Sequence, residues 1–383
     1  MYKDDEEQRR VWQLLESVAV TNFSDSWFER AVGLAKGIKH LDLLASLAAR
    51  HKMMPALARF YRSARLASDL PAGMRDTLAA SLARNQYEVG KLRDESIDIA
   101  GRFAELGISV AFNKGVVLQY NLYDGCGIRS FNDIDIMVHP DGASAARKAL
   151  QSLGYVPEQQ YDPDLGQLVQ LPRRTALMYR LYPDHLPHFH RIDPESGIPV
   201  FIVDVALSLT WHGSAWQFPM DEVMGSAREA RVGPQDRHVL PTLGDGYAFL
   251  FVMLHLFRNC WFERAIAEGE LRLSQFADVW RYWQRWGRKH AEQVRTLVGE
   301  NGLEPAVAWV AYYVDALYGS TMTADLGLRS FCAPEWLRSV AGTDGGYRSW
   351  DGDMHGRLFG RASVALKPAG EPPYGALARG RFS

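Results

Sequence analysis

Residues 107–138 read GISVAFNKGVVLQYNLYDGCGIRSFNDIDIMV, and this stretch decides the fold. A short β-rich run at 108–112 is followed by an apolar helical run at 116–123 and then by an alternating run at 132–138. Alternation of apolar and polar residues is typical of a strand that is buried on one face. We therefore expect a strand, a helix and a second strand in this order, as in a sheet covered by helices.

The segments on either side complete the expected fold. Residues 143–153 are expected to form a helix that ends at Gly154, and the turn residues 193–197 separate the two strands of a hairpin. Helical spacing of apolar residues dominates before Gly107 and again after residue 212. The fold class that follows is α+β, with a small mixed-sheet core flanked by N-terminal and C-terminal helical domains. The expected boundaries are 1–106 for the N-terminal helical region, 107–212 for the core, 213–345 for the C-terminal helical domain and 346–383 for an irregular tail.

The composition argues against several classes of protein. Of the 383 residues, 23% are charged, and the formal net charge is only −2. This balance gives no general attraction to nucleic acid or to an anionic membrane, although a local basic patch would still allow nucleic acid as a partner. The longest apolar run, 247–257, is too short to cross a bilayer, so no membrane partner is expected. A charged N-terminus and three widely spaced cysteines without a CxxC pair favour the cytoplasm.

Two acids in the run 132–138 form the main candidate site. Asp133 and Asp135 are separated by one residue, so the strand period of two places both carboxylates on one face. Adjacent carboxylates repel each other unless a cation lies between them. Mg²⁺ prefers oxygen ligands and is usually held by one or two carboxylates together with substrate phosphates. An Asp-x-Asp pair by itself is also common on solvated strands and turns.

A third acid fits the same plan. Asp204 lies between Val203 and Val205 in an apolar run, where a buried carboxylate without a partner is costly. A metal at the neighbouring strand would be such a partner, whereas on an edge strand the side chain would simply face water. The combination of three acids on expected strands favours a magnesium site at Asp133, Asp135 and Asp204.

These motifs resemble a known family, the uncharacterised nucleotidyltransferases of the polymerase-β-like superfamily. The motifs that carry the resemblance are Lys114-Gly115, Arg129, the run 132–138 and Gly154-Tyr155. Weaker, helical similarity extends to the segment Leu47–His51 and to His255, Arg272 and Asp278. The chain departs from the pattern in two places. Superfamily members more often have Gly-Ser where this chain has Lys114-Gly115, and relatives often have His where this chain has Val205.

The resemblance implies a nucleotidyltransferase core and an enzyme that moves a nucleoside monophosphate from a nucleoside triphosphate to an acceptor. Asp133, Asp135 and Asp204 would hold Mg²⁺ beneath the triphosphate, and Asp204 would also help to activate the acceptor hydroxyl. Lys114 would bring positive charge to the triphosphate, and Gly115 would let the backbone approach it. The expected donor is ATP, which would transfer AMP. The acceptor would offer a hydroxyl or a phosphate, with a peptide or a small molecule favoured.

Several alternatives remain open from the sequence. Arg129 would either bind a substrate phosphate or neutralise the acids when no metal is present. His185, His188 and His190 precede the hairpin, and on a strand His188 and His190 would share a face. That face either lies toward Asp204, which would give His190 a substrate-binding role, or is a polar surface.

The alternatives for the whole protein are a toxin-like enzyme that adds nucleotides to tRNA and a non-catalytic module that binds nucleotide or a partner. The near-neutral charge argues weakly against the first. The presence of all three acids together with Lys114 argues against the second, because a degenerate enzyme would be expected to lose its metal ligands.

Overall fold

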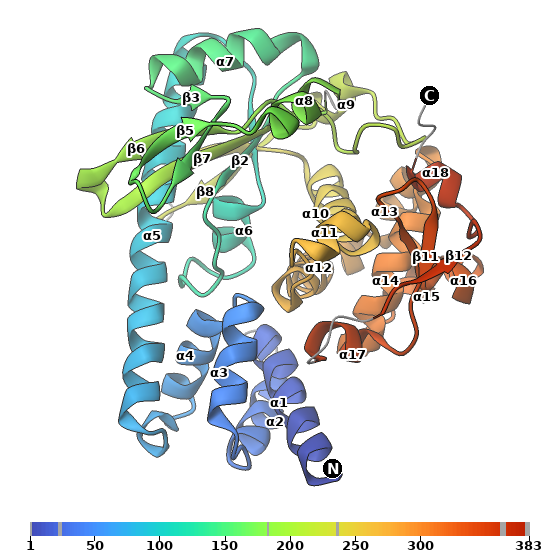
Figure 1. The fold of residues 1–383 in the computed structure, drawn as a ribbon. Helices are drawn as coiled ribbons and strands as arrows, with labels where there is room; N and C mark the ends of the chain where they lie inside the picture. The colour runs from blue at the N-terminus through green and yellow to red at the C-terminus, as the bar shows by residue number, and fades with distance from the viewer. Residues whose placement is uncertain (1, 22–24, 182–183, 235–236, 361–364, 380–383) are drawn as a thin grey trace. The chain divides into compact units, whose positions relative to one another are not determined.

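The computed structural model describes residues 2–21, 25–181, 184–234, 237–360 and 365–379 (Figure 1). The chain divides into two compact units. The first consists of Met1–Asn85, Ile128–Ser130 and Val252–Ser383, and the second of Gln86–Gly127 and Phe131–Phe251. Two helices, α5 (Ala72–Glu105) and α10 (Asp245–Trp261), contribute residues to both units.

A seven-stranded mixed sheet is the centre of the second unit. Its strand order is β3-β6-β7-β2-β1-β9-β8. The strands are β1 (Ala111–Asn113), β2 (Ile134–Met137), β3 (Val156–Pro157), β6 (Phe189–Asp193), β7 (Ile198–Ala206), β8 (Arg228–Val232) and β9 (His238–Thr242). The pairs β2–β7 and β1–β9 are parallel, and the other neighbours are antiparallel. This mixed sheet with helical flanks confirms the α+β fold class.

Alternation along the strands gives the sheet one apolar face. Ile134 and Ile136 of β2 and Val203 of β7 belong to one buried cluster with Phe103 of α5 and Ala146 of α7 (Ala143–Ser152). Each of these five residues is at most 2% exposed. The odd positions of β2 therefore face the side of the sheet away from this core.

The local expectations near the sheet are confirmed as elements, with bounds that are shorter or shifted by a few residues. The runs 108–112, 116–123 and 132–138 correspond to β1, α6 (Gly115–Asn121) and β2, and 143–153 corresponds to α7. The hairpin is formed by β6 and β7, with the 3₁₀ turn η4 (Pro194–Ser196) between them. The second unit also contains the hairpin of β4 (Gln159–Asp162) and β5 (Gln167–Gln170), and the helices α8 (Arg173–Leu181) and α9 (Met220–Gly225).

Strands also occur where only helices or irregular chain were expected. Within 213–345 the structure has β8, β9 and β10 (Ser339–Ala341). Within 346–383 it has β11 (Tyr347–Ser349), α17 (Met354–Phe359), β12 (Lys367–Ala369) and α18 (Gly375–Arg379). The expectation of exclusively helical and irregular structure there was wrong. The sequence does not reveal these strands because they are short and carry few apolar residues. In β8, only Ala230 and Val232 are buried. The domain boundaries themselves stay predictions.

The first unit is mainly helical. Its helices include α1 (Tyr2–Val20), α2 (Asp25–Ala35), α3 (Leu41–Arg50), α4 (Met54–Ser63), α11 (Glu263–Ala267), α12 (Leu273–Arg285), α13 (Ala291–Glu300), α14 (Glu304–Tyr318), α15 (Met322–Asp325) and α16 (Pro334–Leu337). The strands β10, β11 and β12 form a small antiparallel sheet. Trp261, Trp309 and Trp336 are fully buried in this unit. In the described part of the chain, we find no helix with the length and apolar character needed to cross a membrane.

Candidate active site

The three predicted acids gather where β2 and β7 run side by side. These strands are parallel, and their register pairs Asp135 with Asp204. Because Ile134 and Val203 face the apolar core, the two carboxylates lie together on the opposite face of the sheet. Asp133 lies in the bend immediately before β2 and is half-buried. The strand pairing thus brings together acids that are about seventy residues apart in sequence.

Lys114 supplies the nearest positive charge. Its Nζ lies 2.5 Å from Oδ1 of Asp135, and both side chains are largely buried. The same Nζ lies 5.3 Å from the centre of the Phe251 ring, at a distance typical of a cation–π contact. Burial, together with the charges of Asp133 and Asp204, nevertheless raises the pKa of Asp135 to about 7. One lysine therefore does not offset the negative charge of this cluster.

The backbone of Lys114 is unusual. Its φ of 39° and ψ of −122° lie in a region that residues with a side chain rarely adopt. Such a conformation costs roughly 1–3 kcal/mol and persists where the surroundings impose it, often at functional sites. Here it joins the end of β1 to the start of α6 and accompanies the ion pair with Asp135.

Gly115 is explained by close packing. A Cβ atom at this position would lie 3.1 Å from Cδ2 of Phe131 and 3.3 Å from the backbone oxygen of Asp133. Both distances are tighter than ordinary van der Waals contact, so the start of α6 approaches the loop before β2 only because residue 115 has no side chain. Gly115 thereby helps to hold the loop that carries Asp133. Its approach to a phosphate stays a prediction.

Asn113 is a site residue that sequence reasoning missed. It pairs with Asp135 in the antiparallel register of β1 and β2, and it is 3% exposed. Its Nδ2 donates to the backbone oxygen of Ala111, whereas its buried Oδ1 accepts from none of the described residues. The signal available in the sequence was its position between the expected strand at 108–112 and Lys114.

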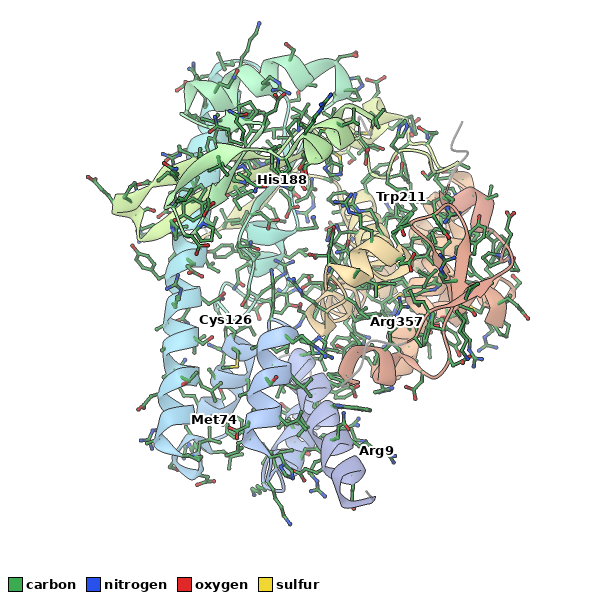
Figure 2. The ribbon with its side chains drawn as sticks, viewed as in Figure 1. Arg9, Met74, Cys126, His188, Trp211 and Arg357 are labelled. Atoms are coloured by element: carbon green, nitrogen blue, oxygen red, sulfur yellow. The ribbon has the colours of Figure 1, made fainter. Side chains whose placement is uncertain are left out.

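The histidines before the hairpin lie beside Asp204, whereas Lys114 lies beside Asp135. Nδ1 of His185 is 3.0 Å from Oδ1 of Asp204, and Nε2 of His188 (labelled in Figure 2) is 3.6 Å from the same oxygen. Burial by itself would raise the pKa of Asp204, but the two histidines outweigh it and hold that pKa well below its ordinary value. The expectation that the histidine face lies toward Asp204 is confirmed for His188.

His190 lies one step further along the same face. It pairs with Ile202 in the register of β6 and β7, and it is 7% exposed. Burial and the neighbouring His188 lower the pKa of His190, so its ring is neutral at pH 7. Its Nδ1 has no hydrogen-bond partner among the residues that the structure describes. A substrate-binding role for His190 stays a prediction.

Arg129 is placed differently from the acids. It belongs to the first unit, whereas Asp133, Asp135 and Asp204 belong to the second. Its guanidinium donates to both carboxylate oxygens of Asp278 on α12, with Nη2 at 2.9 Å from Oδ2. Both side chains are largely buried, so the pair is a structural link within the first unit. Binding of Arg129 to a phosphate stays a prediction.

The donor chemistry of the triad fits a hard divalent cation. Three carboxylates are hard oxygen ligands, and burial together with the charges of Asp133 and Asp204 raises the pKa of Asp135. As they stand, no three His, Cys, Asp or Glu side chains among the described residues surround one point as metal ligands. The ammonium of Lys114 instead pairs directly with Asp135.

A known protein family matches a large part of the chain. No curated protein sequence matches the chain. The sequence model of one family, described as "uncharacterised nucleotidyltransferase", matches residues 39–319. This range covers more than half of the chain and includes every site residue from Asn113 to Asp204. The chain therefore belongs to the uncharacterised nucleotidyltransferase family.

Proposed function

We propose that the protein transfers a nucleoside monophosphate from a nucleoside triphosphate to an acceptor, with release of pyrophosphate and with Mg²⁺ as cofactor. The observation that carries the proposal is the register of β2 and β7, which pairs Asp135 with Asp204 on the face that also bears Lys114. ATP is the expected donor, so AMP would be transferred. Membership of the family supports a nucleoside triphosphate as substrate.

Four residues of the site have roles in this proposal. Asp133, Asp135 and Asp204 would hold Mg²⁺, which supplies positive charge to the phosphates when it is bound. Lys114 binds the triphosphate through its ammonium group and offsets charge on the departing pyrophosphate. The low pKa of Asp204 makes it a weak base, so it orients the acceptor hydroxyl by accepting its hydrogen bond.

The acceptor is proposed to be a peptide or a small molecule with a hydroxyl or a phosphate. A formal net charge of −2 offers little general attraction to a polyanion such as tRNA, which supports this choice. We also propose that the protein acts in the cytoplasm, because none of Cys126, Cys260 and Cys332 forms a disulfide in the part of the chain that the structure describes.

The test is an incubation of the full chain with each of the four ribonucleoside triphosphates, Mg²⁺ and separate pools of peptides, small hydroxylated compounds and tRNA. Mass spectrometry should show addition of one nucleoside monophosphate to a peptide or small molecule, with ATP the best donor. Asp135→Asn should abolish the addition. Full Mg²⁺-dependent transfer by Asp135→Asn would refute the site, and transfer to tRNA alone would refute the proposed acceptor.

A further inference from the structure

We propose that His185 is a positioning residue that fixes the carboxylate of Asp204 for its role at the metal. The inference rests on the proposed function of the same site. It concerns a side chain that sequence analysis singled out only as part of a histidine cluster. Three features carry it: the hydrogen bond between the two side chains, the backbone pairing that holds His185, and the contrast with His188.

The backbone around His185 is fixed to the end of β7. Leu186 N–H donates to the oxygen of Val205 at 3.0 Å, and Leu207 N–H donates to the oxygen of Asp184 at 2.8 Å. His185 itself forms an antiparallel bridge with Ala206. The backbone that carries the imidazole is therefore hydrogen-bonded to β7, the strand that bears Asp204.

The hydrogen bond has a defined direction. An ionised carboxylate oxygen can only accept, so Nδ1 of His185 carries the hydrogen and donates it to Oδ1 of Asp204 at 3.0 Å. On the other side of the ring, Nε2 lies 3.9 Å from Oδ2 of Asp184. The side chains of His185 and Asp204 are each 16% exposed, so little water competes for the bond.

His188 differs from His185 in its distance to Asp204 and in its exposure to solvent. Its Nε2 lies 3.6 Å from Oδ1 of Asp204, beyond hydrogen-bond distance, and its side chain is 44% exposed. Both histidines place an imidazole beside the same oxygen, but only His185 donates a hydrogen bond to it. Removing His188 therefore controls for the loss of an imidazole near Asp204.

The consequence concerns the orientation of Asp204. A donor bound at Oδ1 stops the carboxylate from turning about its Cβ–Cγ bond, so Oδ2 keeps one direction. Loss of a group that hydrogen-bonds a ligating carboxylate typically weakens metal binding about 10–100-fold. We expect the same range for loss of the imidazole of His185.

The experiment measures binding of Mn²⁺, as a probe of the magnesium site, to the full chain by electron paramagnetic resonance of the free ion. The variants are His185→Leu, His185→Asn, His188→Leu and Asp135→Asn, each with its thermal unfolding midpoint. Leu removes the donor, whereas Nδ2 of Asn occupies the place of Nδ1 and keeps it. We expect the affinity for Mn²⁺ to fall about 10-fold or more in His185→Leu. In His185→Asn and His188→Leu we expect it to change less than about threefold, which is smaller than the loss typical of a missing hydrogen bond to a ligating carboxylate.

The outcomes separate this inference from the proposed function. If Asp135→Asn weakens Mn²⁺ binding but His185→Leu does not, the metal site stands and the positioning role is refuted. If His185→Asn binds as weakly as His185→Leu, the hydrogen bond is not what matters, and the inference is again refuted. If neither Asp135→Asn nor His185→Leu changes the affinity, the metal site itself fails and the inference fails with it.

Discussion

Acidification should destabilise the first unit through His51, a buried histidine at the end of α3. Nδ1 of its ring accepts from the backbone N–H of Leu273 at 3.2 Å, and its Nε2–H donates to the backbone oxygen of Leu358 at 3.1 Å. The ring is therefore satisfied only in its neutral form. Burial, with a smaller contribution from Arg50, lowers the pKa of His51 to about 3.

The sign and size of this loss of stability follow from the difference between the pKa of His51 in the folded chain and in the unfolded chain. The unfolded chain binds a proton at His51 below its ordinary pKa of about 6.5, whereas the folded chain does not until about 3. Stability from this residue is thus complete above pH 6.5 and is lost as the pH falls toward 3. Between pH 7.5 and pH 5 the loss is about 2 kcal/mol, since each pKa unit corresponds to about 1.4 kcal/mol.

The assay is urea unfolding followed by tryptophan fluorescence at pH 7.5, 6 and 5, with His51→Gln as the comparison. Gln keeps a donor near Leu358 and cannot titrate. His355 acts in the opposite direction, because its hydrogen bond to Glu16 raises its pKa and stabilises the fold at acid pH. That contribution is common to both proteins, so their difference isolates His51. The wild type should lose about 2 kcal/mol more than the variant, and parallel pH profiles would refute the reasoning.

Three further predictions follow from the site and its supports. Lys114→Ala should lower turnover about a hundred- to a thousandfold. Lys114→Gly should be equally slow, but its fold should be more stable than that of Lys114→Ala, because glycine accepts the φ of 39°. Turnover rates and thermal unfolding midpoints of both variants check this. Arg129→Leu should cost about 3–5 kcal/mol in urea unfolding by leaving Asp278 buried without its partner, and addition of Asp278→Leu should recover part of the loss. Gly115→Ala should cost about 1–3 kcal/mol by overpacking against Phe131, and a thermal midpoint equal to wild type would contradict that account.

The acidic strand could be predicted because its signal is local. Alternation through Ile134, Asp135 and Ile136 predicts both the strand and the face of each of these side chains, whereas Asp133 lies in the bend before it. Asp204 could be predicted as a site residue for a similar reason, since it interrupts an apolar strand that follows a clear turn. Burying Ile134 and Val203 on one face then places Asp135 and Asp204 on the other, whereas the pairing of β2 with β7 is seen only in the structure.

The rest depends on contacts between residues far apart in the sequence. The partner of Arg129 is Asp278, 149 residues away, and no local pattern links them. The hydrogen bond of His185 requires the chain before β6 to pair with the end of β7, which a period of two does not reveal. Strand β8 lies at the edge of the sheet with β9 beside it, and each has only five residues, which is too short for a clear alternation.

The division of the chain has a consequence for synthesis on the ribosome. The first unit is assembled from three separate stretches, and its last one begins only at Val252. At about 5–20 residues per second, the chain between Asn85 and Val252 takes on the order of 10–30 s to make. During that time, apolar residues of helices α1 to α4, such as Leu14 and Leu57, lack part of the surroundings that bury them in the finished unit. Helices α1 to α4 would therefore be a target for chaperones that recognise exposed apolar segments until the residues from Val252 onward are made.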